Sequence, residues 1–493
     1  MAGLAGQLKE RSARAELLLA VFLAVLLFPA LCHARWKHAI IDKGTFLAVA
    51  VGNDGVSHYL YESESRAITH LAIDPEGKRL ASEAIIGLAL GVGNGQIAVD
   101  SHNHLHVVLS DSRLGLQYGF YDGTTWNVQD IPNSPPCVGA YLAVDDSDQP
   151  HVASFCDYQS PAIAGVYHLA LNGSTWSYEL VAPEPVFPPG VGALAAAGIF
   201  VTSDGTVHIG YTMEPAALCE AVKRSGSWTE NCGCADVHAD FLRLVGLVPM
   251  ALDSAARPHF VYDAIANGLS AGLDYCYFDG TNWNTQTIST IAFDGALAID
   301  SFDVAKVVLL EPSKPKSMTG GPTLAVYGKL QGTTWQFQTI ARAPSLELVG
   351  MSLDPLGLPH AGATAPTFPN TFAVYAFLAE PDLTATWQSI ETATNRRGAL
   401  IVTGNLDVVN QGTAAGSGFT VKFYLSDSAV LGSDATFLGQ KSVSLGVGAK
   451  TTLKFTFKPS GAVSGKYLIA NITSRNPQNE ANTANNTAAG QIP

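Results

Sequence analysis

The sequence predicts an all-β protein made of a seven-bladed β-propeller and a smaller C-terminal β-sandwich. Three observations lead to this prediction. A unit of about 50 residues with four strand-like segments recurs seven times within residues 35–393. After residue 393 the pattern changes to alternating segments separated by Gly, Ser and Asn turns. Charged residues make up only 14% of the chain and there are 47 Gly, as expected of a chain rich in strands and turns.

The first 34 residues have the layout of a secretory signal peptide. A basic stretch precedes an apolar run from Leu17 to Leu31, and the segment ends at Ala34. The run of about 15 residues is shorter than the roughly 20 that span a membrane. Lipidation at Cys32 is the alternative, and it is disfavoured because Leu31 stands where a small residue is needed. We therefore expect a secreted or cell-surface protein with no transmembrane segment.

Each repeat joins an alternating apolar segment, a polar turn, a His and a second alternating segment. The His positions are His58, His106, His151, His208, His259 and His360, with Lys306 in the sixth repeat. Six residues earlier stand Asp100, Asp145, Asp253, Asp300 and Asp354, with Gly52 and Thr202 in the other two repeats. About 20 to 29 residues after the His position stand Trp126, Trp176, Trp228, Trp283, Trp335 and Trp387.

The Trp belongs to a turn of the type "DGTTW", which we interpret as the outer hairpin of a blade. Two hairpins give four strands, and such a sheet buries both faces only when neighbouring sheets stack in a closed ring. The first repeat lacks this Trp. Either the segment that begins at Trp36 or the segment "TWQSIET" from Thr386 supplies the last strand of the ring, and the sequence leaves this choice open.

The units "LAVDDSDQPHVASFCD" and "FYDGTTWNVQDI" resemble repeats of secreted bacterial propellers and, more loosely, the Asp-box (BNR) repeats of sialidases. This likeness implies a fold and no particular activity. The turn is one residue shorter than an Asp box, and no arginine pattern matches the carboxylate-binding cluster of sialidases. Sialidase activity is therefore not expected.

Residues 394–493 resemble the CARDB family of bacterial extracellular domains. The matching stretches are "NQGTAAGSGFTVKFYLSD", "LGVGAKTTLKF" and "NEANTANN". The resemblance implies an immunoglobulin-like β-sandwich that displays or spaces other domains in cell adhesion. It implies no catalysis.

Six of the seven cysteines follow residue 34, which favours disulfide bonds in a secreted chain. A zinc site is the alternative, but no second Cys pair stands at finger spacing. Cys137 and Cys156 are symmetric about one hairpin turn, and Cys219 and Cys232 about another, so each pair is directly opposed across two strands. We expect the bonds Cys137–Cys156 and Cys219–Cys232, which leaves Cys234–Cys276 by elimination.

The repeated Asp and His admit two interpretations. They could form an acid–base pair, but a group present in almost every repeat is expected to hold the turn of its own blade. No catalytic residue is therefore assigned. His102, His104 and His106 are weak candidates for metal ligands, because alternate residues of a strand share one face. Asp427 and Asp434 are weak candidates for a Ca²⁺ site, and no other cofactor is expected.

The formal net charge of −14 makes nucleic acid an unfavourable partner. The preferred hypothesis is a non-catalytic protein that binds an extracellular glycan or protein. A carbohydrate-active hydrolase or lyase that uses the propeller funnel is the alternative, and a structural surface component is a third possibility. A carboxylate pair in a deep pocket would favour the enzyme, and exposed aromatic platforms would favour a lectin.

Overall fold

The computed structural model describes residues 36–89, 94–111, 115–132, 137–156, 164–183, 195–213, 217–234, 250–266, 269–313, 322–367, 370–474 and 480–493. The expected signal peptide at 1–34 lies outside these ranges. The described residues contain strands and turns and no helix, so the all-β prediction is confirmed. Among them, no helix is long and apolar enough to cross a membrane. The chain divides into two compact units, which are mainly His38–Phe377 and Leu378–Pro493.

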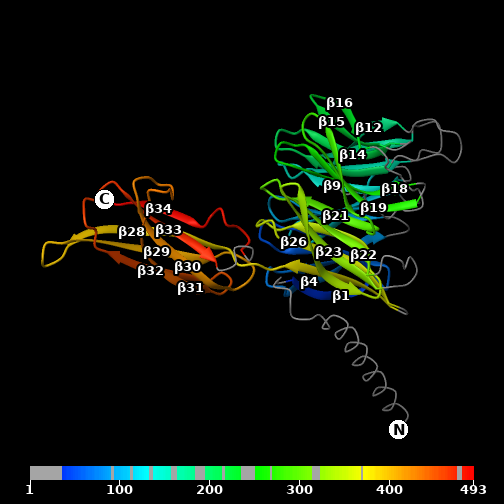
Figure 1. Ribbon diagram of the computed structural model, residues 1–493. Coiled ribbons are helices and arrows are strands. Elements are labelled where there is room, and N and C mark those ends of the chain that lie inside the picture. The colour runs from blue at the N-terminus through cyan, green and yellow to red at the C-terminus, as the bar shows by residue number, and fades with distance from the viewer. Residues whose placement is uncertain are drawn as a thin grey trace, which may run out of the picture. The chain divides into compact units, whose positions relative to one another are not determined.

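The N-terminal unit contains five antiparallel sheets of four strands each, in which neighbours along the chain pair in order (Figure 1). Their strands are β5 (Gly95–Val99), β6 (Leu105–Asp111), β7 (Gly115–Tyr121), β8 (Trp126–Asp130), β9 (Cys137–Val144), β10 (Pro150–Cys156), β11 (Gly165–Asn172), β12 (Thr175–Pro183), β13 (Ala195–Val201), β14 (Val207–Met213), β15 (Ala217–Arg224), β16 (Ser227–Gly233), β17 (Met250–Leu252), β18 (Pro258–Ala266), β19 (Leu269–Phe278), β20 (Trp283–Ser289), β21 (Asp294–Ile299), β22 (Ala305–Pro312), β23 (Thr323–Gln331) and β24 (Thr334–Ala343).

A sixth sheet joins the two ends of this unit in the strand order β25-β26-β27-β1-β2-β3-β4. Its strands are β1 (Trp36–Val51), β2 (Ser57–Ser63), β3 (Ala67–Ile73), β4 (Arg79–Ala89), β25 (Glu347–Leu353), β26 (Pro359–Thr367) and β27 (Asn370–Leu378). The long strand β1 lies between β27 and β2, and its part from Gly44 to Val51 pairs with β2. The strand that begins at Trp36, and not the segment from Thr386, therefore lies beside β27.

The hydrophobic cores of this unit lie between adjacent sheets. Leu60 of β2 shares a cluster with Val107 of β6, and Val108 of β6 shares another with Val152 of β10. Because strand side chains alternate between the two faces, each sheet packs against the next on both sides. The arrangement is therefore β-propeller-like.

The C-terminal unit contains two sheets with the orders β28-β29-β32 and β31-β30-β33-β34. The strands are β28 (Leu383–Thr394), β29 (Leu400–Asn410), β30 (Gly416–Ser426), β31 (Thr436–Leu445), β32 (Lys450–Phe457), β33 (Tyr467–Ser474) and β34 (Thr487–Gln491). Leu406, Phe423 and Leu468 lie in one buried core to which both sheets contribute. This unit is a β-sandwich.

The expected boundary at residue 394 is too late, and the assignment of Trp387 to a propeller repeat is wrong. Strand β28 contains Trp387 and pairs along its whole length with β29. The Trp387 indole packs against the sandwich core and its Nε1 donates to the Ala488 carbonyl at 3.2 Å. The error arose because the local alternation of "TWQSIET" is the same as that of a blade strand.

Candidate functional site

The turns between the first two strands of the sheets are built around the repeated Asp. Asp145 shows the pattern: its Oδ1 accepts the backbone N–H groups of Ser147 and Gln149, both at 2.8 Å. Asp100, Asp253 and Asp300 make the same two contacts with their own turns. The carboxylate therefore satisfies donors that the tight turn leaves unpaired.

The repeated His is held mainly by the third strand of its own sheet. Its Nδ1 lies 2.5–3.0 Å from a polar side chain there, in the pairs His58–His70, His106–Tyr118, His151–His168, His208–Glu220 and His259–Tyr275. The partner stands two residues before the one directly opposite the His in the strand register. The sequence pattern alone did not identify this position as the partner of the repeated His.

The expected Asp–His contact is short in only one of these turns. Nε2 of His151 lies 3.3 Å from Asp145. The corresponding distances from the His Nε2 to the Asp Oδ2 are 3.6 Å for His106 and His259 and 3.7 Å for His360. These distances are longer than a hydrogen bond. His360 instead contacts the Ser57 hydroxyl at 2.7 Å. Lys306 replaces the imidazole with a buried ion pair to Asp300 at 2.7 Å.

Burial keeps several of these imidazoles neutral. It lowers the pKa of His58 and of His168 to about 3, and that of His70 to about 4. It also lowers the pKa of His106, His151 and His259. A buried imidazole that does not gain a proton near neutral pH is poorly suited to general acid–base work. Burial and the contacts with the third strand together support an anchoring role for the repeated His.

The repeated Trp side chains pack on the preceding sheet. Trp176 meets Tyr118 edge-on with ring centroids 5.3 Å apart, and Trp335 meets Tyr275 in the same way at 5.3 Å. Trp228 packs edge-on against His168 at 5.7 Å. The repeated turn thus supplies a similar packing group where these sheets adjoin.

The three metal-ligand candidates do not form one group. His106 is buried and faces Tyr118. His102 and His104 instead lie with Asp100, and one possible ligand atom from each of these three residues falls within 4.8 Å of the others. Nδ1 of His104 lies 3.0 Å from Asp100 Oδ2, and Nδ1 of His102 lies 2.7 Å from Asp148 Oδ2.

The two Ca²⁺ candidates have protein partners. Asp427 forms an ion pair with Lys466 at 2.6 Å, and the Ser426 hydroxyl donates to Asp434 at 3.3 Å. The two carboxylates are not among the metal-competent groups found in the described part of the chain.

The structure contains the disulfide bonds Cys137–Cys156, Cys219–Cys232 and Cys234–Cys276. The first two join residues directly opposite each other in neighbouring strands, with Cα atoms 4.0 and 4.1 Å apart. The third joins the residue after β16 to β19 in the next sheet. The pairs are those expected from the sequence.

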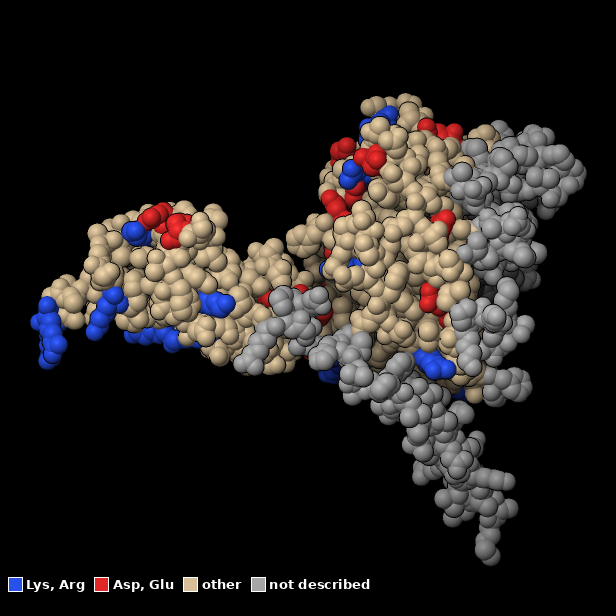
Figure 2. All heavy atoms as spheres, viewed as in Figure 1, with Lys and Arg blue, Asp and Glu red and all other residues tan. Residues whose placement is uncertain are grey.

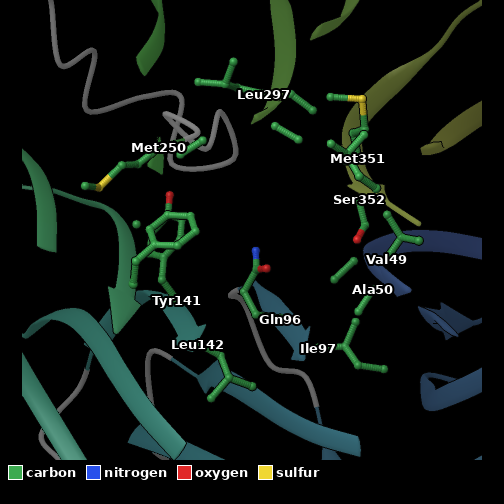
Figure 3. A pocket seen from close by; sticks show the side chains of 18 of the residues that line it. Val49, Ala50, Gln96, Ile97, Tyr141, Leu142, Met250, Leu297, Met351 and Ser352 are labelled. Carbon is green, nitrogen blue, oxygen red and sulfur yellow. The ribbon is translucent and has the colours of Figure 1, made fainter. Parts of the chain in front are cut away.

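The first strands of the sheets surround a cavity of about 410 Å³ (Figure 3). Strands β1, β5, β9, β13, β17, β21 and β25 all contribute lining residues, most of which are aliphatic. Three polar side chains belong to the lining, namely those of Gln96, Tyr141 and Ser352. Burial raises the pKa of Tyr141, so its hydroxyl remains a hydrogen-bond donor. Among the residues that the structure describes, those that line the cavity include no Asp, Glu, His, Lys or Arg.

Charge on the visible surface of the N-terminal unit is dispersed. Figure 2 shows acidic and basic side chains scattered among uncharged ones on this face. A continuous basic strip, which a polyanion would require, is not seen among the described residues of the N-terminal unit on this face.

Residues 380–490 match the CARDB family, so the chain carries a CARDB domain in this region. No curated protein matches the chain. Among solved structures, a polysaccharide lyase described as an ulvan lyase is similar over 68% of this chain and 95% of its own, with 9% identity and a TM-score of 0.48. The β-propeller domain of Swd1 from Myceliophteria thermophila covers 68% of this chain and 98% of its own, with 9% identity and a TM-score of 0.43. The six-bladed Aleuria aurantia lectin covers 61% and 96%, with 12% identity and a TM-score of 0.37.

Proposed function

We propose that this chain is a secreted or cell-surface binding protein with a seven-bladed propeller, akin to BNR repeats in fold only. In this proposal the central cavity holds a neutral group of an extracellular glycan, and the CARDB domain displays the propeller. The blade count is supported by the seven strands that contribute to the cavity and by strand β1, which lies between β27 and β2 and so joins the two ends of the propeller.

The observation that carries the proposal is the chemistry of the cavity wall. Gln96, Tyr141 and Ser352 offer amide and hydroxyl groups that are uncharged near neutral pH, among aliphatic side chains. A cavity of about 410 Å³ lies within the range of about 300–1,000 Å³ that is usual for small-ligand sites. Neutral donors and acceptors on an apolar wall suit the hydroxyl groups and C–H faces of an uncharged sugar.

The same wall argues against cleavage in this cavity. Hydrolysis of a glycosidic bond commonly uses a pair of carboxyl groups, and a lyase needs a base that removes a proton. The part of the cavity wall that the structure describes provides neither a carboxylate nor an imidazole. The raised pKa of Tyr141 also makes its phenol a poor base near neutral pH.

Extracellular location is supported by two features. The CARDB resemblance implies display outside the cell. Three disulfide bonds suit an oxidising compartment.

The test is a glycan array followed by calorimetry with the strongest neutral oligosaccharide. Tyr141→Phe, Gln96→Ala and Ser352→Ala each remove one polar group from the cavity. Each should weaken binding about 2- to 10-fold, since a hydrogen bond contributes about 0.5–1.5 kcal/mol. Ser442→Ala, an exposed position of β31, is the matched control and should bind like the wild type. Unchanged affinity in all three cavity variants would move the binding site elsewhere.

A further inference from the structure

The turn between β5 and β6 differs from its equivalents in a way that the repeat does not require. The repeated Asp opens the turn, and the third and fifth positions of this turn are His102 and His104. The same two positions are Ser147 and Gln149 in the β9–β10 turn and Phe302 and Val304 in the β21–β22 turn. The anchoring role of the repeat is filled by His106, so it does not explain these two extra imidazoles.

The two imidazoles lie against two carboxylates. Asp100 Oδ2 is 3.0 Å from His104 Nδ1. Asp148 comes from the neighbouring β9–β10 turn, and its Oδ2 is 2.7 Å from His102 Nδ1. The Ser101 N–H and hydroxyl also donate to Asp148, at 2.9 and 3.0 Å, which fixes this carboxylate. The four side chains therefore form one cluster across two adjacent turns.

The β17–β18 turn shows what the corresponding place holds in another sheet. Arg257 stands in the position of His104, and its guanidinium contacts Asp253 Oδ2 at 2.5 and 2.6 Å. Asp303 stands in the position of Asp148, and it accepts bonds from the Ser254 N–H and hydroxyl, both at 2.7 Å. A permanent cation thus lies on the repeated carboxylate in this sheet.

No Lys or Arg side chain pairs with Asp100 or Asp148 among the described residues. A divalent metal ion bound by the two imidazoles would supply a positive charge at this place. Imidazole nitrogen and carboxylate oxygen are ligands that Zn²⁺ prefers, with bonds of about 2.0–2.2 Å. Tetrahedral ligands at such bond lengths lie about 3.4 Å apart. One possible ligand atom from each of Asp100, His102 and His104 lies within 4.8 Å of the others, so each pair is at most about 1.4 Å from that spacing.

We propose that Asp100, His102 and His104 form a Zn²⁺ site. In this site Asp148 holds the His102 ring through Nδ1. The side chain of Asp100 is 2% exposed and that of His102 is 69% exposed, so one ligand is fixed inside the turn and another can close over an arriving ion. A carboxylate that orients a metal-bound imidazole in this way is a common outer-shell arrangement. The site lies on the turns, and none of its residues lines the central cavity.

The test uses the purified chain without an affinity tag, stripped with a chelator and desalted. ZnCl₂ is titrated by calorimetry, and bound metal is counted after dialysis. The wild type should bind one Zn²⁺ per chain. His102→Ala together with His104→Gln should abolish this binding, and Asp148→Ala should weaken it about 10- to 100-fold. Phe302→Ala, which changes the position equivalent to His102, is the matched control and should bind like the wild type.

A gain-of-site variant makes the test independent of losses through misfolding. Ala255→His with Arg257→His places two imidazoles beside Asp253 and Asp303, and it should raise the stoichiometry from one Zn²⁺ to two. A wild-type chain that binds no Zn²⁺ would overturn the proposal. Undiminished binding by the variant that lacks both His102 and His104 would also overturn it, because the ion would then lie elsewhere.

Discussion

Nδ1 of His151 lies 3.0 Å from Nε2 of His168, and the two rings stack with an angle of 9° between their planes. His58 and His70 repeat this relationship at 3.0 Å and 18°. Two facing imidazole nitrogens share one hydrogen, so the contact holds while both rings are neutral. Protonation of both rings of a pair would place two N–H groups against each other inside the protein.

These pairs predict loss of stability in acid. The pKa of His58 and of His168 is lowered in the folded protein, mainly by burial, to about 3 from an ordinary value of 6.5. Below pH 6.5 the unfolded chain therefore binds more protons than the folded one. The stabilisation is fully present above pH 6.5 and is lost as the pH falls toward 3. Unfolding by urea should show a loss on the order of 1 kcal/mol per pH unit for each such His.

His70→Tyr and His168→Tyr are the matched variants for this prediction. Tyr118 and Tyr275 already occupy the equivalent positions opposite His106 and His259. The double variant should keep the contact and make the dependence of stability on pH less steep between 6.5 and 4.5, because His70 and His168 no longer contribute while His58 still does. An equally steep dependence in this variant would show that other groups cause the acid sensitivity.

The sixth repeat should be far more sensitive than its neighbours to loss of the repeated carboxylate charge. Asp300→Asn keeps an oxygen for the turn but removes the carboxylate charge that lies 2.7 Å from the buried Lys306 ammonium. This change should lower the free energy of unfolding by about 3–5 kcal/mol. In the seventh repeat Asp354 lies 3.7 Å from the imidazole of His360. Asp354→Asn should therefore lower the free energy of unfolding by only about 1 kcal/mol. Equal losses in denaturant melts of the two variants would refute the difference.

Trp387 should stabilise the C-terminal unit and have no part in a blade. Trp387→Ala removes a ring that packs against Phe423, with ring centroids 6.0 Å apart. Hydrogen exchange followed by mass spectrometry should show faster exchange in β29, β30 and β33 and unchanged exchange in β25–β27. Faster exchange in β25–β27 with an unchanged sandwich would restore the original assignment to the propeller.

The disulfide Cys234–Cys276 should stabilise the contact between two neighbouring sheets, because it joins the end of β16 to β19. Replacement of both cysteines by Ser should cost about 2–4 kcal/mol. Peptide mapping without reduction should recover all three pairs from the wild-type chain. Recovery of Cys234 bound to any other cysteine would contradict this pairing.

The strand repeat and the hairpin disulfides could be predicted because both depend on local sequence. Alternation marks each strand, and Cys219 and Cys232 are symmetric about their turn, so their opposition follows from counting residues. The partner of the repeated His was missed because hairpin lengths vary. His70 follows His58 by 12 residues, whereas His168 follows His151 by 17.

The residues that line the central cavity could not be predicted, for a different reason. Its wall comes from seven strands that are distant in sequence, and residues such as Leu142 have the pattern of ordinary core positions. Gln96 and Ser352 lie 256 positions apart, and only ring closure brings their strands to one cavity. For Trp387 the local prediction of a strand was correct, but local alternation does not say which sheet a strand joins.

The proposed function requires that the cavity bind a neutral glycan without cleaving it. The most direct measurement incubates the array-selected oligosaccharide with the wild-type chain and follows both bound ligand and newly formed chain ends over a day. We expect saturable binding that Tyr141→Phe weakens, with no more new ends than a heat-denatured control produces. Steady release of new ends that Tyr141→Phe abolishes would contradict this expectation and would identify the cavity as an active site.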